Sequence, residues 1–356
     1  MDKDKILSEF KKLQQQIMFD IDNTTGMIKL KNQYRLKSIT VAVKALEKYN
    51  KTKITIKDLS DLLKIKGIGE GTIRRIKEIL DTGKLSEIKI TESDKLYLKM
   101  IEELEEIYGI GRVTAYKLFK EHRITSIDEL LKKINKKEIT VPENVMKGIK
   151  YAGQLDTKIP LDEITDIGEF ILDIMFDIDV RLFGTICGSY RRQIDTSGDA
   201  NLNSSADEFL PKKKSNAFCS DVDFIIIHHD YKTESSKIEV NYLDVVVRKL
   251  IEKNFIIDSL TKTDVKTKYM GIFKWKDSKP RRIDIRIFPL ESYYSAILYF
   301  TGSKDFNRQM RLNAIAHDYT LNEYGLFDEN NKMFKVNSEK EIFDLLGMEY
   351  ITPDKR

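Results

Sequence analysis

The sequence predicts a multidomain protein in which an all-helical part is followed by an α+β part. At 356 residues the chain is long enough for two or three domains of about 150 residues. Before residue 150, apolar side chains recur at the three- and four-residue spacing of amphipathic helices. After residue 150, the segments 221–227 and 281–287 are rich in β-branched residues and partly alternate, as strands do.

The helical part shows its periodicity in successive segments. Apolar residues at helical spacing are Ile6, Phe10, Leu13 and Ile17, then Ile39, Val43 and Leu46, then Leu59, Leu62 and Leu63, and then Leu98, Ile101, Leu104 and Ile107. Pro142 and Pro160 mark the end of this part. Beyond the two predicted strands, helices are expected again at 293–299 and 306–316.

Composition excludes several other classes of protein. Hydrophobic residues make up 41% and charged residues 33% of the chain, which is not the composition of a disordered protein. Its apolar runs are far shorter than the ~20 residues of a membrane helix, and its start lacks a signal-peptide core. Cys187 and Cys219 are too few for a disulfide framework or a zinc set. We expect an intracellular protein of a reducing compartment, nuclear or cytoplasmic, and the Lys-, Ile- and Asn-rich usage also fits a viral origin.

Charge is unevenly distributed, although the net charge is only +4. Residues 1–90 hold 20 Lys and Arg against 12 Asp and Glu, whereas residues 151–356 hold 29 against 34. A basic first part suits the binding of a polyanion, and an acidic second part suits metal ions or another cationic group. Solvated lysine-rich helix faces would explain the same numbers equally well.

One internal repeat falls in the helical part. The segments LLKIKGIGEGTIRRI (62–76) and LEEIYGIGRVTAYKL (104–118) align without a gap. Each predicts a helix, a Gly-x-Gly turn and a second helix, whose N–H groups can hold a phosphate without reading a base. A single copy would more often be an ordinary helical corner. Two matched copies in a basic region resemble helix-hairpin-helix motifs, and their turn glycines are Gly67, Gly69, Gly109 and Gly111.

Two carboxylates stand at the head of the first predicted strand. Asp221 and Asp223 are two residues apart, so their side chains point to the same face of that strand. On the second predicted strand, Asp284 shares one face with Arg282 and Arg286. If the strands are neighbours, three carboxylates can converge on a site for a hard cation such as Mg²⁺. An isolated Asp-x-Asp pattern is more often a solvated pair.

The surrounding motifs resemble a known family. Cys187-Gly-Ser-Tyr-Arg-Arg, followed by Asp-x-Asp and a third Asp on a later strand, resembles the nucleotidyltransferase superfamily. The further motifs YFTGS (299–303) and NEY (322–324), with Asn307, Arg308 and Arg311, resemble family X DNA polymerases of the beta type. This resemblance covers essentially the whole chain.

The resemblance implies a layout of four parts. These are a basic helical lyase-like, 5′-phosphate-binding domain (1–91), a second helical DNA-binding subdomain (92–155), a catalytic nucleotidyltransferase palm (156–290) and a small α+β nucleotide-selection subdomain (291–356). The motif Ser197-Gly198-Asp199 leads into a polar stretch rather than a strand, so we assign the metal ligands to Asp221 and Asp223 instead. Residues 199–219 are then an insertion, whose Lys212, Lys213 and Lys214 either contact DNA or are solvated.

The resemblance also implies roles for individual residues. Asp221, Asp223 and Asp284 would be the catalytic residues and would hold two Mg²⁺ ions, which Mn²⁺ can replace. Residues expected to bind the nucleotide are Gly188, Ser189, Arg192, Ser220, Tyr299, Phe300, Gly302 and Asn307. Residues expected to bind DNA are Tyr34, Arg35, Gly67, Gly69, Arg75, Gly109, Gly111, Arg282, Arg308, Arg311 and Tyr324.

Two positions depart from the family pattern. Arg75 stands where beta-type enzymes have the lysine that forms a Schiff base with a 5′-deoxyribose phosphate, and arginine cannot supply a neutral amine. Lys77 is the nearby candidate, so we expect 5′-phosphate binding with weak or rerouted lyase activity. Lys147 is the candidate replacement for an arginine that holds the γ-phosphate.

The resemblance thus implies a template-directed, gap-filling repair DNA polymerase. Its partners would be gapped or nicked duplex DNA and deoxynucleoside triphosphates, with no membrane, and the chain would act as a monomer. The short stretch 270–281 favours template use. Two alternatives remain: a template-independent terminal transferase, and a catalytically inactive DNA-binding scaffold.

Overall fold

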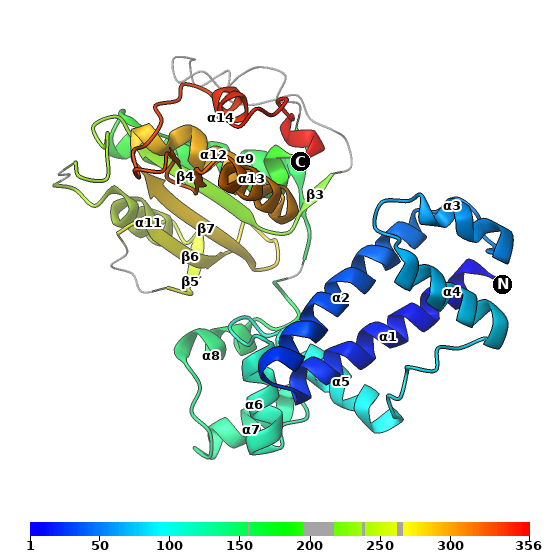
Figure 1. Ribbon diagram of the computed structural model, residues 1–356. Coiled ribbons are helices and arrows are strands. Elements are labelled where there is room, and N and C mark those ends of the chain that lie inside the picture. Colours follow the sequence, from blue (N-terminus) through cyan, green and yellow to red (C-terminus); the bar gives the residue numbers. More distant parts are fainter. Residues whose placement is uncertain (156, 195–216, 237–238, 262–265) are drawn as a thin grey trace. The chain divides into compact units, whose positions relative to one another are not determined.

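The chain folds into two compact units, Met1–Ile149 and Lys150–Arg356 (Figure 1). This computed structural model describes residues 1–155, 157–194, 217–236, 239–261 and 266–356. The first unit is built of helices and the second of a mixed sheet with helices, which confirms the predicted order of an α part and an α+β part. Most of the expected insertion lies outside the described residues, and this part includes Lys212, Lys213 and Lys214.

The first unit contains two apolar clusters. The first cluster joins α1 (Lys3–Asn23), α2 (Gly26–Glu47), η1 (Ile56–Asp58), α3 (Leu59–Leu63) and α4 (Glu70–Thr82). The second joins α5 (Glu92–Glu105), α6 (Arg112–His122), α7 (Ile127–Asn135) and α8 (Glu143–Lys150). The apolar residues predicted at helical spacing are buried in these clusters, except Leu59, which is partly buried, and Leu63, which is 46% exposed. Phe19 of α1 packs edge-on against Tyr97 of α5, with ring centroids 5.7 Å apart, so the two clusters are in contact.

The two copies of the repeated sequence form similar glycine turns. Gly67 and Gly109 have φ angles of +100° and +90°, in the left-handed region that favours glycine. After each of them the chain turns into α4 or α6, with Gly69 and Gly111 at the residue before the helix. Each repeat thus forms a helix, a glycine turn and a second helix, and their role as helix-hairpin-helix motifs stays a prediction.

The second unit is organised by a five-stranded sheet of order β2-β4-β7-β6-β5. The strands are β2 (Leu182–Ile186), β4 (Val222–His228), β5 (Ile256–Ser259), β6 (Lys268–Phe273) and β7 (Arg281–Phe288). Strands β4 and β7 are parallel neighbours, and the other pairs are antiparallel. Both strands predicted from the sequence are thus present and adjacent.

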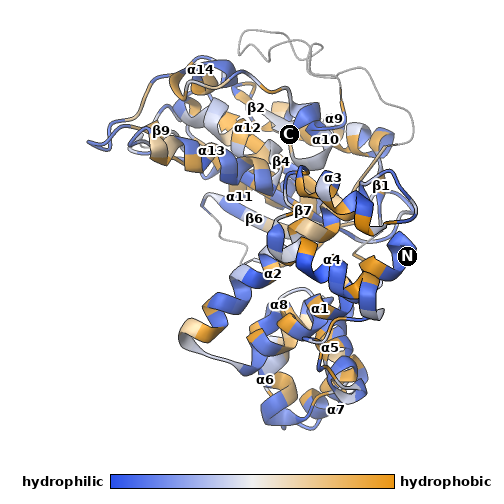
Figure 2. Cartoon of the chain, turned by 45° about the vertical axis from the view of Figure 1, so that its right-hand side comes forward, coloured by the Kyte–Doolittle hydropathy of each residue, from blue (hydrophilic) through white to orange (hydrophobic). Residues whose placement is uncertain are grey.

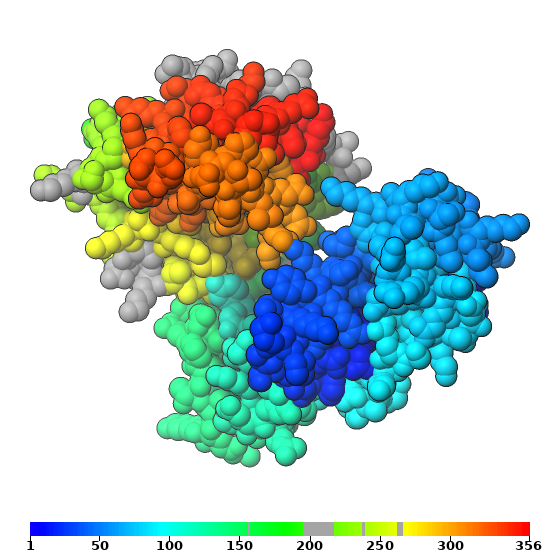
Figure 3. Space-filling view, in the orientation of Figure 1, coloured from blue at the N-terminus to red at the C-terminus, as the bar shows by residue number. Residues whose placement is uncertain are grey.

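Helices cover both faces of this sheet (Figure 1). Helices α9 (Leu161–Ile178) and α11 (Tyr242–Glu252) pack on one face. Helices α12 (Tyr293–Thr301), α13 (Lys304–Ala316) and α14 (Glu339–Leu345) pack on the other, and Figure 3 shows this C-terminal segment in orange and red. Short elements complete the unit: β1 (Ile159–Pro160), α10 (Gly188–Arg191), β3 (Phe218–Cys219), η3 (Leu290–Ser292), β8 (Thr320–Leu321), β9 (Leu326–Phe327) and η4 (Pro353–Lys355). Over the described residues, no helix is both long and apolar enough to cross a bilayer.

Candidate functional site

The strand register brings the predicted carboxylates to one place. Asp223 of β4 lies directly opposite Asp284 of β7 in the parallel ladder. Both side chains are partly buried, between fully buried neighbours that point to the opposite face. Asp221 stands one residue before β4, so the same register places it opposite Arg282. Four of the predicted site residues therefore share one end of one sheet face.

Gly188 leaves the space that the Asp223 carboxylate occupies. A Cβ at position 188 would lie 2.2 Å from Asp223 Oδ2, and the backbone there has a φ of +59°. The preceding Cys187 N–H donates to the Asp223 carbonyl at 2.8 Å, which holds the turn against β4. Both the space and the backbone angle thus require glycine.

Burial and neighbouring charges raise the pKa of both Asp223 and Asp284. Burial, and then the charges of Asp221 and Asp284, raise the pKa of Asp223 to about 7. Burial also raises the pKa of Asp284, against the opposing effects of Arg282 and Lys268. Within the described residues, the buried Oδ1 of Asp284 has no hydrogen-bond partner. A bound divalent cation would offset the repulsion between the carboxylates and would give Asp284 Oδ1 a partner, so these oxygen ligands fit Mg²⁺.

One of the three expected ligands is held elsewhere in this state. Arg282 Nη2 donates to Asp221 Oδ2 at 2.5 Å. Over the described residues, no three acidic, histidine or cysteine side chains are already gathered as a metal cluster. The chemistry of the ligands suits the ion, but their arrangement still requires a side-chain movement.

The raised pKa of Asp223 predicts how stability depends on pH. Because the pKa of about 7 in the folded state lies above the ordinary aspartate value of 3.8, the folded state binds the proton more tightly. Protonation of Asp223 therefore stabilises the folded state fully below about pH 4, and this stabilisation is lost as the pH rises through about 7. The free energy of unfolding falls by at most about 4 kcal/mol, at 1.4 kcal/mol per pH unit. Urea denaturation of the metal-free protein should therefore show a loss between about pH 5 and 8 that Asp223→Asn lacks. Equal pH profiles of the two proteins would contradict this assignment.

The residues expected to hold phosphate surround the α10 turn. The Arg192 guanidinium donates to the Thr301 carbonyl at the end of α12, and a Cβ on Gly302 would lie 3.3 Å from Arg192 Nη1. Lys158 Nζ donates to Ser220 Oγ at 2.8 Å, beside Asp221. Lys158 was not predicted as a site residue, because it reaches Ser220 only through the pairing of β1 with β3.

Lys147 lies on α8 in the first unit. Its Nζ forms an ion pair with Glu143, one turn earlier on the same helix, at 2.8 Å. A role of Lys147 at the γ-phosphate stays a prediction.

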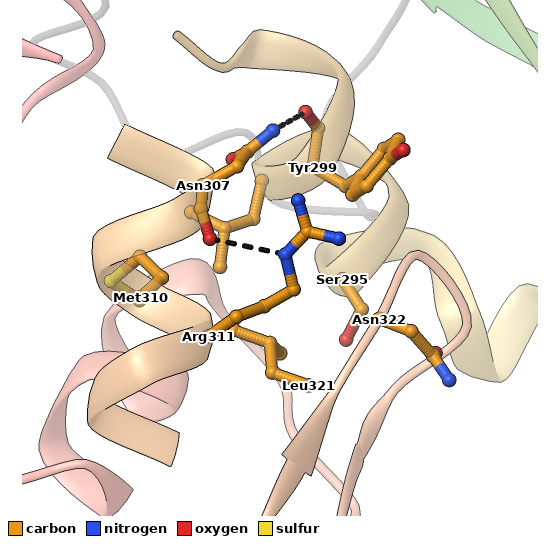
Figure 4. A pocket seen from close by; sticks show the side chains of 8 residues that line it. Ser295, Tyr299, Asn307, Met310, Arg311, Leu321 and Asn322 are labelled. Carbon is orange, nitrogen blue, oxygen red and sulfur yellow. Dashed lines mark hydrogen bonds between the residues drawn. The ribbon is translucent and has the colours of Figure 1, made fainter. Parts of the chain in front are cut away.

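A small open pocket lies between α12 and α13 (Figure 4). Asn307 Nδ2 donates to the Tyr299 carbonyl at 2.6 Å, and Arg311 Nε donates to the Asn307 carbonyl at 3.3 Å. The Arg311 guanidinium also lies 5.8 Å from the centre of the Tyr299 ring. Three residues predicted from the resemblance thus line one pocket, while Arg308 is exposed on α13.

Phe300 and Tyr324 meet at the far end of β7. Both rings pack against Phe288, with centroids 5.7 Å and 5.4 Å away. Arg286 lies over the Phe300 ring at 5.4 Å and is 3.5 Å from a carboxylate oxygen of Glu323. The strand that carries Asp284 therefore also positions these two aromatic residues.

A buried ion network holds α10 against the C-terminal helices. Glu339 accepts hydrogen bonds from Arg191 at 3.0 Å and from Arg356 at 2.7 Å. Arg191 also donates to the Thr301 hydroxyl at 2.7 Å. The sequence does not reveal this network, because its members are far apart along the chain and share no motif.

In the first unit, the residues expected at a 5′-phosphate are held by an acidic residue. Glu87 accepts from Arg75 Nε at 2.5 Å and also from Arg35. Burial alone would raise the pKa of Glu87, but the hydrogen bond and charge of Arg75, with the charge of Arg35, lower it. Tyr34 is 67% exposed on α2, a helix whose first turn is also apolar and exposed (Figure 2), and Lys77 is exposed on α4.

Comparisons with known proteins agree with this geometry. The model of the DNA polymerase beta palm matches residues 158–215 and 211–290, and that of the DNA polymerase beta thumb matches residues 296–356. The chain is 27% identical over 336 residues to a DNA polymerase lambda of Arabidopsis thaliana, and 24% identical over 342 residues to one of Rattus norvegicus. These alignments cover 88% and 91% of this chain but 56% and 53% of the relatives, so the chain spans about half the length of the curated relatives it matches.

A mixed sheet with carboxylates on two adjacent parallel strands, beside a Gly-Ser turn, defines a palm of the nucleotidyltransferase class. The two family models extend that class through the C-terminal subdomain and together match more than half of the chain. The chain belongs to family X of the DNA polymerases.

Proposed function

We propose that this chain is a template-directed DNA polymerase that fills short gaps during repair. The observation that carries the proposal is the register of Asp223 opposite Asp284, with Gly188 leaving room for the Asp223 carboxylate. The domain boundaries near residues 91, 155 and 290 belong to the same proposal, as do a monomeric state and an intracellular location.

The acidic residues of the palm are proposed to hold two Mg²⁺ ions, which Mn²⁺ can replace. Bound there, the ions would lower the pKa of the primer 3′-hydroxyl and stabilise the charge on the departing pyrophosphate. Asp284 is the proposed acceptor of the 3′-hydroxyl proton, because its carboxyl has a raised pKa and an oxygen that lacks a hydrogen-bond partner among the described residues. Asp221 and Asp223 complete the ligand set.

The triphosphate is proposed to bind at the α10 turn. Ser189 can donate its hydroxyl, and Arg192 offers a planar fork to two phosphate oxygens. Lys158 adds a second cationic side chain, which donates a hydrogen bond to Ser220. Tyr299, Phe300 and Gly302 would pack on the sugar, with Asn307 at the minor-groove edge of the base.

Gapped or nicked duplex DNA is the proposed partner. Two glycine turns, at residues 67–69 and 109–111, lead into helix N-termini. Such N-termini suit backbone phosphates, as those of helix-hairpin-helix motifs do. Arg282 would meet the primer backbone, whereas Arg308, Arg311 and Tyr324 would lie on the template side. Binding of this kind weakens steeply with salt.

One assay separates this function from its alternatives. The protein is given DNA with a one-nucleotide gap, Mg²⁺ and each of the four deoxynucleoside triphosphates in turn. Insertion of the base that the template specifies supports the proposal. Insertion that ignores the template indicates a terminal transferase, and DNA binding without extension indicates a scaffold.

Lyase activity is predicted to be weak. Arg75 cannot form a Schiff base, and it is already paired with Glu87. Borohydride should therefore trap little protein on a 5′-deoxyribose-phosphate end, even though DNA with a 5′-phosphate binds. Efficient trapping that Lys77→Ala abolishes would show that the activity has moved to Lys77, and efficient trapping that survives this change would refute the assignment altogether.

A further inference from the structure

Arg282 and Asp221 are cross-strand neighbours at the entrance to the carboxylate site. The register pairs Val222 with Ile283 and Asp223 with Asp284, so one further step towards the start of the strands places Asp221 beside Arg282. The ion pair at 2.5 Å follows from that placement. It is therefore built by the sheet itself.

The other two arginines of β7 have different partners. Arg281 points to the opposite face, where it pairs with Glu163 of α9. Arg286 shares the face of Asp284, but its carboxylate partner is Glu323. Of the three arginines, Arg282 is the one that the structure pairs with an expected metal ligand.

A guanidinium at Asp221 competes with a divalent cation for the same oxygen atoms. Asp221 and Arg282 are only partly buried, with side chains 28% and 33% exposed, so solutes can reach the pair. A DNA phosphate is a suitable competitor for Arg282, because it accepts the planar fork in the same bidentate way as a carboxylate. One exchange of partners would therefore release Asp221.

We propose that Arg282 gates the metal site and that a phosphate of the primer strand opens the gate. Without DNA, Arg282 holds Asp221 and keeps the ligand set incomplete. When the primer terminus binds, Arg282 moves to a phosphate and Asp221 becomes available to the metal ion. This inference rests on the proposed function, because it uses the primer contact assigned to Arg282. It adds an order of events in which DNA binding raises metal affinity.

The test measures Mn²⁺ binding directly, from the electron paramagnetic resonance signal of the unbound ion. Wild type is compared with Arg282→Met, which removes the guanidinium, and Arg282→Lys, which keeps a charge without the fork. The matched control is Arg286→Met, which removes a cation from the same strand face but leaves Asp221 paired. Asp221→Asn gives the background, including metal that binds to DNA, and a thermal melt shows that each variant is folded.

Without DNA, Arg282→Met is expected to bind Mn²⁺ about tenfold more tightly than wild type, and Arg286→Met less than about threefold. Arg282→Lys should lie between wild type and Arg282→Met. Gapped DNA should raise the Mn²⁺ affinity of wild type by about the same tenfold and that of Arg282→Met little, because coupling between two ligands is reciprocal and its carrier is gone.

Three results would overturn the gate. These are an Arg282→Met affinity equal to that of wild type, an equal gain in Arg286→Met, and an equal effect of DNA on wild type and Arg282→Met. The DNA-free arm needs no polymerase activity, so it still tests the contact if the proposed function fails. That failure is seen separately, as wild-type protein that binds Mn²⁺ and gapped DNA but inserts no nucleotide.

Discussion

Replacing Asp284 by asparagine is expected to slow nucleotide insertion by about a thousandfold or more, because metal and proton-transfer contributions amount to several kcal/mol. Asp284 is the proposed acceptor of the 3′-hydroxyl proton and one of the three proposed metal ligands, and an amide is poor at both tasks. The measurement is single-turnover insertion of the templated nucleotide into a one-nucleotide gap. Affinity for gapped DNA should change little, since the substitution removes no cation.

The control for this variant is Asp277→Asn, which neutralises an exposed carboxylate in the turn before β7. It should insert nucleotides at close to the wild-type rate. The metal-free Asp284→Asn protein should also be at least as stable as wild type at about pH 8, because it loses a charge that raises the pKa of Asp223. Insertion by Asp284→Asn within tenfold of wild type would refute the role of this carboxylate.

The sequence could predict those parts of the fold that depend on short-range patterns. The spacing of Ile6, Phe10, Leu13 and Ile17 identifies a buried helix face, and α1 buries all four. Two-residue alternation identifies β7, where Arg282, Asp284 and Arg286 share one face. The repeated Gly-x-Gly turns needed no tertiary information, because the backbone angle of Gly67 and Gly109 is a local requirement.

Other parts of the site depend on contacts between distant segments. Nothing near Glu87 in the sequence shows that it lies between Arg35 and Arg75, which the fold brings together. Lys158 similarly reaches Ser220 only because β1 pairs with β3. Charge by itself could not show which lysines and arginines of this chain have a partner in the fold, since most of them could equally have been solvated.

The Asp221–Arg282 pair shows the same limit within a correct prediction. The two-residue period correctly placed Asp221, Asp223 and Asp284 on the same face of two strands. The period alone could not show which residue of the neighbouring strand lies opposite each carboxylate, because the register of a parallel pair is set by the whole sheet. That register decides that Asp223 faces another acid while Asp221 faces an arginine.

Gly188→Ala is expected to lower nucleotide insertion by about a hundredfold or more, the effect of misplacing a reacting group by roughly 1 Å. The new Cβ would lie 2.2 Å from Asp223 Oδ2, so either the carboxylate or the α10 turn must move. Strain adds to this, because a φ of +59° costs a residue with a side chain about 1–2 kcal/mol. The readouts are the insertion rate and direct Mn²⁺ binding, both of which should fall.

Gly347→Ala separates the two causes. Gly347 has nearly the same φ, +60°, but a Cβ there would meet only His317 Nε2 at an ordinary 3.8 Å. It should therefore lose stability of the same size while keeping its insertion rate and Mn²⁺ affinity. If both glycine variants lost activity alike, backbone strain would explain the result and the contact with Asp223 would not. If Gly188→Ala remained fully active, the space at Gly188 would not be what positions the Asp223 carboxylate.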